Sequence, residues 1–213
     1  MKCVKKQMPL YAVTDRAWLN GRPLCEVVEA ALRGGATCMQ LREKELEREL
    51  FLREAVELVG LCRRYGVPLI VNDDVEIALE SGADGVHIGQ HDAAAAGVRQ
   101  RIGPEKVLGV SAQTVEQAVK AERDGADYLG VGAVFSTGTK LDADDVSYET
   151  LTAICRAVNV PVVAIGGISK SNLGQLAGSG IDGVAVVSAI FAAADIRAAA
   201  RELRKTVQKE LGV

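Results

Sequence analysis

Five charged side chains have the types and positions needed to bind a diphosphate together with a metal ion. They are cations and carboxylates that follow short apolar segments of the chain: Arg42, Lys44, Asp73, Asp92 and Lys140. Mg²⁺ typically takes one or two protein carboxylates together with phosphate oxygens and water. Guanidinium and ammonium groups bind phosphate oxygens directly. The set therefore predicts a Mg²⁺–diphosphate site, with Asp73 and Asp92 as the metal ligands and one ion per subunit.

Small residues in three other segments are suited to binding a phosphate monoester. These segments are Thr137–Thr139, Gly166–Gly167 and Val187–Ser188. Backbone N–H groups at such positions can bind a phosphate without a formal positive charge. A Gly-Gly pair alone is more typical of a tight turn. Because Val187–Ser188 follows the next apolar run, the pattern favours a second phosphate site.

Eight apolar runs rich in Val, Ile and Leu precede these residues. They span 10–14, 34–41, 68–72, 81–89, 106–111, 124–132, 161–167 and 179–187. They lack a clean alternation of polar and apolar residues, which is typical of parallel strands buried on both faces. Between several of them lie segments with apolar residues at helical spacing, at 45–65, 114–124, 147–158, 169–178 and 195–211. This alternation predicts a closed (β/α)₈ TIM barrel, one α/β domain over residues 1–213.

An open, doubly wound sheet is the alternative for such an alternation. It normally carries a GxGxxG motif after its first strand, whereas residues 14–21 read TDRAWLNG. The sequence therefore favours the closed barrel. Active-site residues of such barrels lie at the C-terminal ends of the strands, so both phosphate sites are expected at one mouth.

Composition argues against several classes of protein. Lys+Arg is 25 against Asp+Glu 28, a formal net charge of −3, and 4% of residues are aromatic. Nucleic-acid binders are usually basic and stack bases on aromatic rings. The cysteines number five and form no CxxC, which disfavours a disulfide framework. The apolar stretch 183–194 is too short to cross a bilayer. We expect a cytoplasmic protein with small-molecule partners and no nucleic acid or membrane, and the sequence leaves a homo-oligomer open.

Lys140 and His87 allow other chemistry. Lys140 could form a Schiff base, but such a lysine needs apolar, desolvated surroundings, whereas Asp142, Asp144 and Asp145 follow it closely. His87 could be a general base, although a histidine within an apolar run is more often structural. Both alternatives are therefore weaker than the phosphate-binding interpretation.

The motifs resemble those of the thiamine phosphate synthase family over nearly the whole chain. The segments that carry the resemblance are YAVTD (11–15), QLREK (40–44), IVNDD (70–74), GVHIGQHD (85–92), GVSAQT (109–114), GVGAVFSTGTK (130–140), VVAIGGI (162–168) and GVAVVSAI (183–190). The family loop commonly reads Pro-Thr-x-Thr-Lys, and here Ser136 stands in place of the proline. Because Thr137, Thr139 and Lys140 remain, we expect altered loop rigidity and intact contacts.

The resemblance implies a reaction and a role for each residue. Hydroxymethylpyrimidine diphosphate and hydroxyethylthiazole phosphate would condense to thiamine phosphate, releasing diphosphate in a dissociative displacement that needs no general base. The residues implied to bind the pyrimidine diphosphate are Gln40, Arg42, Lys44, Asn72, Ser111 and Lys140. Those implied to bind the thiazole phosphate are Thr137, Gly138, Thr139, Gly167, Val187 and Ser188. The implied catalytic set is Arg42, Lys140 and the two Mg²⁺ ligands, Asp73 and Asp92.

Two other functions remain open on the same barrel. A thiazole tautomerase-like isomerase would work without a metal and would not need Asp73, Asp92 and Lys140 together. A non-catalytic sensor of a phosphorylated ligand would not need a complete diphosphate site. Both alternatives make less use of the charged residues than the synthase reaction does.

Overall fold

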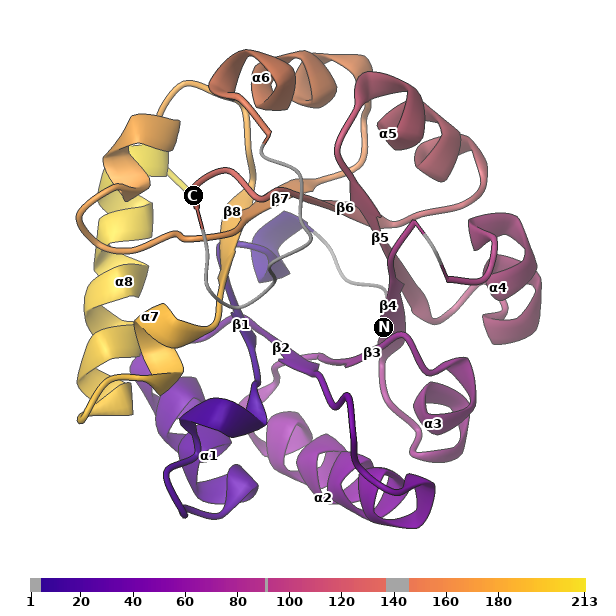
Figure 1. Ribbon diagram of the computed structural model, residues 1–213, viewed down its shortest axis with the longest axis vertical. Helices are drawn as coiled ribbons and strands as arrows, with labels where there is room; N and C mark the ends of the chain where they lie inside the picture. Colours follow the sequence, from indigo (N-terminus) through magenta and orange to yellow (C-terminus); the bar gives the residue numbers. More distant parts are fainter. Residues whose placement is uncertain (1–4, 91, 137–145) are drawn as a thin grey trace.

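Eight short apolar segments form a parallel barrel in the computed structural model, which describes residues 5–90, 92–136 and 146–213. The strands are β1 (Leu10–Val13), β2 (Cys38–Leu41), β3 (Leu69–Asn72), β4 (Gly85–Ile88), β5 (Val107–Ala112), β6 (Tyr128–Val131), β7 (Val162–Ile165) and β8 (Gly183–Val186). Each strand pairs in parallel with the next, and β8 pairs with β1, which closes the sheet (Figure 1). The TIM barrel predicted from the sequence is confirmed. Seven strands lie inside the predicted apolar runs, and β5 extends one residue beyond its run, to Ala112.

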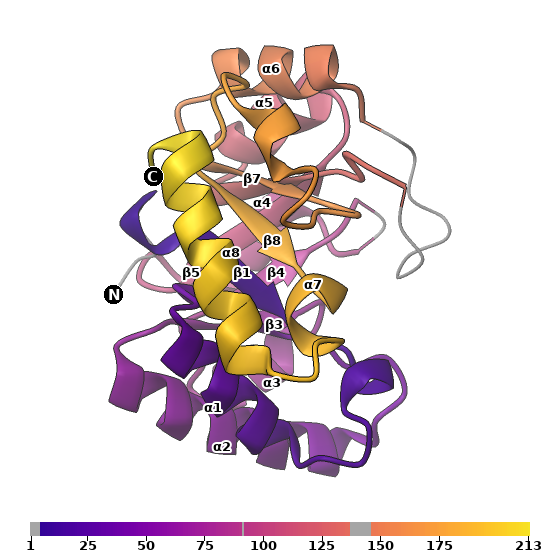
Figure 2. The ribbon, with the colours of Figure 1, turned by 90° about the vertical axis from the view of Figure 1, so that its left-hand side faces the viewer.

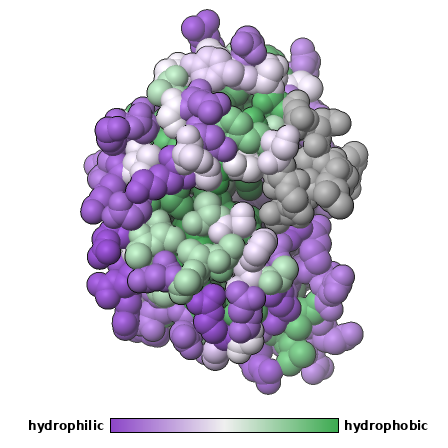
Figure 3. All heavy atoms as spheres, turned by 60° about the vertical axis from the view of Figure 1, so that its left-hand side comes forward, coloured by the Kyte–Doolittle hydropathy of each residue, from purple (hydrophilic) through white to green (hydrophobic). Residues whose placement is uncertain are grey.

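Helices surround the barrel on its outside (Figures 1 and 2). They are α1 (Leu24–Gly34), α2 (Arg48–Tyr65), α3 (Val75–Glu80), α4 (Ala95–Ile102), α5 (Val115–Arg123), α6 (Tyr148–Ala157), α7 (Ser188–Phe191) and α8 (Ile196–Leu211). Figure 2 shows α8 running along the side of the barrel, and it packs against α1 and α7. On this side hydrophilic residues lie around the edge and hydrophobic residues lie toward the middle (Figure 3). Within the described ranges, no helix is both long enough and apolar enough for a membrane span.

The helix predicted over 169–178 is wrong. The structure has only a short 3-10 helix there, Leu173–Leu176. The Asn172 side chain accepts a hydrogen bond from the Ser169 N–H at 2.8 Å, which forms a local turn before the helix could begin. Gly178 takes a left-handed conformation with φ +79° and ends the segment. Side-chain–backbone bonding and glycine therefore override the apolar spacing.

Four helices, α1, α3, α4 and α7, were not predicted from the sequence. α7 has only four residues. α3 has six residues and α4 has eight, which is too short for helical periodicity to be read reliably. α1 has 11 residues, with buried Val27, Val28, Ala31 and Leu32 at helical spacing. Its amphipathic pattern is the signal that could have revealed it.

Alternate residues of the strands divide into two buried clusters. Leu10 and Ala12 of β1 belong to a large cluster that includes the helices, whereas Tyr11 and Val13 belong to a smaller one made mainly of strand residues. Since side chains of a strand alternate between its two faces, this smaller cluster fills the barrel. The same alternation places polar residues above it, toward the C-terminal ends of the strands: Gln40, Asn72, His87 and Ser111. The interior therefore changes from apolar to polar toward one mouth.

Candidate active site

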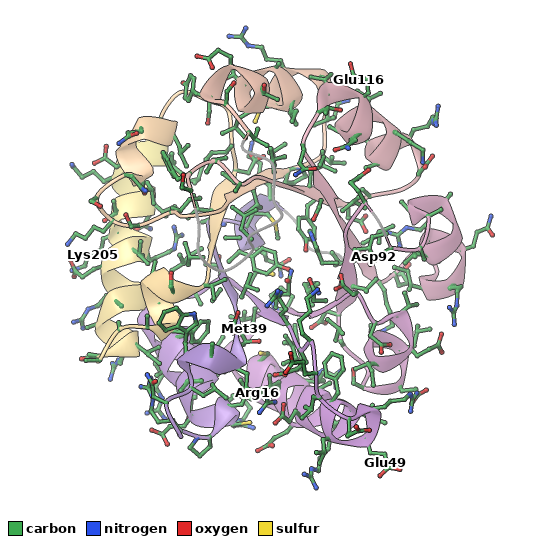
Figure 4. All side chains as sticks on the ribbon, in the orientation of Figure 1. Arg16, Met39, Glu49, Asp92, Glu116 and Lys205 are labelled. Atoms are coloured by element: carbon green, nitrogen blue, oxygen red, sulfur yellow. The ribbon has the colours of Figure 1, made fainter. Side chains whose placement is uncertain are left out.

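The described residues of the predicted site lie at the C-terminal ends of the strands. In chain order they are Gln40, Arg42, Lys44, Asn72, Asp73, Asp92, Ser111, Gly167, Val187 and Ser188. Four predicted residues, Thr137, Gly138, Thr139 and Lys140, lie outside the described residues. Figure 4 shows Asp92 on the barrel side of α4, whereas Lys205 lies at the outer edge of α8. One mouth of the barrel thus collects those of the predicted polar residues that the structure describes.

Asp73 and Asp92 form a pair of neighbouring carboxylates. Partial burial and the negative charge of Asp92 raise the pKa of Asp73. The Lys44 ammonium lies 3.7 Å from Asp73 Oδ2, and the Gly89 N–H donates to Asp92 Oδ2 at 2.6 Å. Two like charges held this close favour a bound cation. The predicted metal ligands are therefore brought together with one of the predicted diphosphate ligands.

The backbone at Asp73 has an unusual conformation for a residue other than glycine. Its φ is +64°, in a left-handed region that Asn, Asp and Gly tolerate best. Its N–H donates to the His87 carbonyl at 2.8 Å, which fixes the turn against β4. Strained backbone of this kind is common at functional sites. The next residue, Asp74, caps α3 by accepting from the Ile77 N–H at 2.8 Å, so the second aspartate of the IVNDD motif is structural.

Arg42 is held by residues that follow β1. Its Nη1 lies 3.2 Å from Asp15 Oδ2, and its backbone N–H donates to Thr14 Oγ1 at 3.0 Å. Arg16 connects the same two loops, with Nε 2.9 Å from Glu43 Oε2. Asp15 and Arg16 were not predicted as site residues from the sequence, although Asp15 belongs to the YAVTD motif. Their ion pairs orient the loop that carries Arg42 and Lys44.

A chain of hydrogen bonds crosses the interior below the mouth. The Gln40 amide donates to the Tyr11 hydroxyl at 2.9 Å, and the Tyr11 and Tyr128 hydroxyls are 2.8 Å apart. His87 Nδ1 lies 2.9 Å from the Tyr128 hydroxyl, and its Nε2 lies 3.0 Å from Ser111 Oγ. The sequence did not identify Tyr11 and Tyr128 as members of a polar network, because a tyrosine within an apolar strand is usually part of the hydrophobic core. His87 is buried in this network, which agrees with its structural interpretation.

Gly166 and Gly167 form a tight turn beside residues 133–136. Their φ values are +104° and +60°, both in the left-handed region. A Cβ on Gly167 would lie 2.5 Å from the Ser136 carbonyl oxygen and 2.8 Å from that of Phe135. The two glycines therefore bring the end of β7 next to Ser136, the residue before the predicted Thr137–Thr139 segment. Val187 occupies the N-cap position of α7 without a side-chain capping bond, and Ser188 begins the helix, at the end of β8.

An open hollow of about 540 Å³ lies beside Asp73, and Asp92 is not among the residues that line it. Lys44, Asn72 and Asp73 line it, together with Phe51 of α2 and Arg101 of α4. Pockets that hold small organic ligands commonly have volumes of several hundred cubic ångströms. The hollow is therefore large enough for a phosphorylated small molecule next to Asp73.

Comparison of the sequence with known proteins gives consistent matches. A family model described as thiamine monophosphate synthase matches residues 10–190. The thiamine-phosphate synthase of Clostridium tetani is 52% identical over 91% of this chain and 93% of that protein. The thiamine-phosphate synthase of Moorella thermoacetica is 49% identical over 97% of this chain and 99% of that protein.

Solved structures agree with the sequence matches. The thiamine phosphate pyrophosphorylase from Pyrococcus furiosus is 40% identical, with a TM-score of 0.90, over 98% of this chain and 99% of that chain. A 3-hexulose-6-phosphate synthase has a TM-score of 0.64 at 20% identity, over 93% of this chain and 99% of that chain. At that identity the likeness concerns the barrel fold alone.

Proposed function

The chain belongs to the thiamine monophosphate synthase family, and on this premise we propose that it joins hydroxymethylpyrimidine diphosphate to hydroxyethylthiazole phosphate. The products are thiamine phosphate and diphosphate, so the protein is a transferase. The observation in the structure that supports this best is the Asp73–Asp92 pair with Lys44 beside it. A site for an anion complexed with a cation is what a diphosphate substrate requires.

The pyrimidine diphosphate is assigned to the mouth around β2, β3 and β5. Its proposed ligands are Gln40, Arg42, Lys44, Asn72, Ser111 and Lys140. Arg42 is oriented by Asp15, and Lys44 lies next to Asp73. The position of Lys44 beside the proposed metal site, and of Arg42 in the same loop, supports a role for both cations in binding the diphosphate. Gln40 and Asn72 come from the ends of neighbouring strands, β2 and β3, and supply amide groups for the heterocycle.

One Mg²⁺ per subunit fits the carboxylate pair. The pKa of Asp73 is raised because burial and Asp92 disfavour a second negative charge, and a divalent cation would remove that repulsion. The ligands are hard carboxylate oxygens, which Mg²⁺ prefers. When bound, the ion neutralises part of the charge of the diphosphate and so makes it a better leaving group.

In the proposed reaction the bond between the pyrimidine methylene carbon and the diphosphate oxygen breaks, and the electron pair leaves with the oxygen. Arg42, Lys44 and Lys140 stabilise the negative charge that develops on the departing diphosphate. The thiazole nitrogen then uses its lone pair to form the new carbon–nitrogen bond. That nitrogen carries no proton, so no general base is needed. Both ring nitrogens of His87 are in hydrogen-bond contact with protein side chains, Tyr128 and Ser111, which is consistent with a reaction that uses no histidine base.

The thiazole phosphate is assigned to the opposite side of the mouth. Its proposed ligands are Thr137, Gly138, Thr139, Gly167, Val187 and Ser188. Gly167 packs closely on Ser136, which directly precedes Thr137–Thr139. This packing supports one phosphate site formed by Gly167 and the two threonines. Val187 and Ser188 begin α7 at the end of the strand next to β7.

Ser188→Asp is expected to weaken binding of the thiazole phosphate. Ser188 is exposed, so an aspartate can be accommodated, and its charge would repel the phosphate at short range. Calorimetry should show a loss of thiazole-phosphate affinity and little change in diphosphate binding. Ser188→Asn is the control, since it has the same shape without the charge. Equal losses for both ligands would contradict two separate sites.

A simple omission experiment separates the proposed function from the isomerase alternative. An isomerase would convert the thiazole phosphate without pyrimidine diphosphate and without a metal. The proposed transferase requires all three components. Thiazole phosphate that is consumed in the absence of the pyrimidine substrate would favour the isomerase.

A further inference from the structure

Five side chains from five strands form one continuous hydrogen-bonded chain inside the barrel. In order they are Gln40 (β2), Tyr11 (β1), Tyr128 (β6), His87 (β4) and Ser111 (β5), with contacts of 2.9, 2.8, 2.9 and 3.0 Å. Both tyrosines are 1% exposed. The two ends of the chain are residues assigned above to the pyrimidine diphosphate. The middle of the chain has no part in the reaction as described so far.

The direction of these hydrogen bonds follows from the Gln40 end. An amide nitrogen can only donate, so the Tyr11 oxygen accepts from Gln40. The Tyr11 hydroxyl contacts two side chains within the described residues, Gln40 and Tyr128, and of these only Tyr128 can accept its proton. A buried hydroxyl without an acceptor is costly. Tyr11 therefore donates to Tyr128.

The same direction continues to Ser111. Tyr128 accepts from Tyr11 and can pass its own proton toward His87 Nδ1. An imidazole that accepts at Nδ1 carries its proton on Nε2, and Nε2 faces Ser111 Oγ at 3.0 Å. Ser111 then accepts from His87, and its hydroxyl proton is available to a ligand. In the reverse direction Ser111 would donate to His87, and Tyr128 would donate to Tyr11. The Tyr11 proton would then have no acceptor, because the Gln40 amide nitrogen can only donate.

We propose that His87 is a positioning residue in its Nε2–H tautomer, fixed by Tyr11 and Tyr128, which turns the Ser111 hydroxyl into a donor to the bound diphosphate. This inference rests on the proposed function for the identity of the anion. A serine hydroxyl can donate or accept, and an anion needs a donor. The chain would thus prepare Ser111 for the anion before the substrate arrives, which reduces the cost of ordering it on binding.

Two glycines make room for this arrangement. Gly109 of β5 pairs in register with both His87 and Tyr128. A Cβ on Gly109 would lie 2.5 Å from His87 Nδ1 and would also collide with the Tyr128 ring and hydroxyl. A Cβ on Gly130 would lie 3.0 Å from His87 Cε1. The strand backbone is therefore shaped around the two rings, which are also in tilted contact, with centroids 5.5 Å apart.

Nitrogen NMR of the imidazole rings tests the direction of the chain. The whole chain contains two histidines, His87 and His91, so a His91→Gln variant assigns both rings in a ¹⁵N-labelled protein. We expect long-range proton–nitrogen correlations to show His87 with a protonated Nε2 and an unprotonated Nδ1. A proton on Nδ1 would overturn the proposal. The spectrum is recorded without substrate, so it stands even if the protein makes no thiamine phosphate.

Two matched variants test whether the chain acts on the substrate. Tyr128→Phe removes the donor to Nδ1, whereas Tyr11→Phe removes one buried hydroxyl but leaves the Tyr128–His87–Ser111 contacts. Tyr128→Phe should change the His87 nitrogen signals and raise KM for the pyrimidine diphosphate about tenfold, the effect of losing one hydrogen bond to a charged group. KM for the thiazole phosphate should not change. Tyr11→Phe keeps the Tyr128 hydroxyl beside Nδ1 and should therefore shift the His87 nitrogen signals less than Tyr128→Phe does.

A purely structural role predicts a different pattern. Both variants would then lower thermal stability to a similar extent and leave both KM values unchanged in the folded protein. That pattern would overturn the positioning role. If a variant fails to fold, the wild-type spectrum still decides the tautomer. A wild-type protein with the expected tautomer but no thiamine phosphate synthesis would refute the proposed function and keep the hydrogen-bond direction.

Discussion

Asp73→Asn is expected to reduce kcat/KM at least about 100-fold, the size of effect seen when one electrostatic stabiliser is lost from an active site. The substitution removes one of the two proposed metal-ligating charges. It keeps the shape of the side chain, and asparagine tolerates the left-handed backbone at this position, where φ is +64°. The fold should therefore survive, and steady-state kinetics with both substrates at varied Mg²⁺ would measure the loss.

Stability separates a metal-binding role from a structural one. Burial and Asp92 raise the pKa of Asp73 in the folded protein, so the ionised carboxylate destabilises the metal-free fold at neutral pH. Asp73→Asn should thus leave the melting temperature of the metal-free protein unchanged or higher. Wild-type protein should be stabilised by Mg²⁺ with diphosphate, and the variant should lose most of that stabilisation.

Asp74→Asn is the matched control for this experiment. Asp74 is the adjacent residue and caps α3 through the Ile77 N–H. Asparagine is an equally good N-cap, so both activity and stability should stay near wild type. Near-wild-type activity of Asp73→Asn in the presence of EDTA would contradict the metal assignment.

Lys140→Ala is expected to lower kcat by more than it raises KM. Lys140 lies outside the described residues, and its role is proposed from the Thr137–Lys140 motif. If it neutralises the leaving diphosphate, its charge matters more in the transition state than in the ground state. The loss in kcat should be on the order of 10²-fold, and Lys140→Arg should restore part of it because the charge returns with different geometry.

The Schiff-base interpretation of Lys140 makes the opposite prediction. Arginine cannot form an imine, so Lys140→Arg would restore nothing. Borohydride with a carbonyl ligand would then trap a covalent adduct, which mass spectrometry can locate. An adduct at Lys140 without release of diphosphate would place this protein among lysine-dependent aldolases.

The sequence predicted the barrel because its periodic signal is strong. Each strand is a short apolar run, and such a run is the expected sequence of a parallel strand that is buried on both faces. The same logic predicted where the charged residues meet, since the C-terminal ends of all strands share one mouth. Asp73, Asp92 and Lys44 come together as expected.

Features set by side-chain contacts between distant residues were not predictable. Tyr11 and Tyr128 lie 117 positions apart, and only the closed barrel brings their hydroxyls together. Asp15 and Arg42 meet because β1 and β2 are neighbours in register, which the residue types alone do not reveal. The helix predicted over 169–178 was wrong because the Ser169–Asn172 turn and Gly178 outweigh apolar spacing.

Direct analysis of the products tests the central claim. The purified protein is incubated with hydroxymethylpyrimidine diphosphate, hydroxyethylthiazole phosphate and Mg²⁺, and the mixture is analysed by mass spectrometry. We predict thiamine phosphate and diphosphate in equal amounts, with neither formed when EDTA is present or when one substrate is omitted. Absence of thiamine phosphate from the complete mixture, with a folded protein that still binds both substrates, would contradict the account.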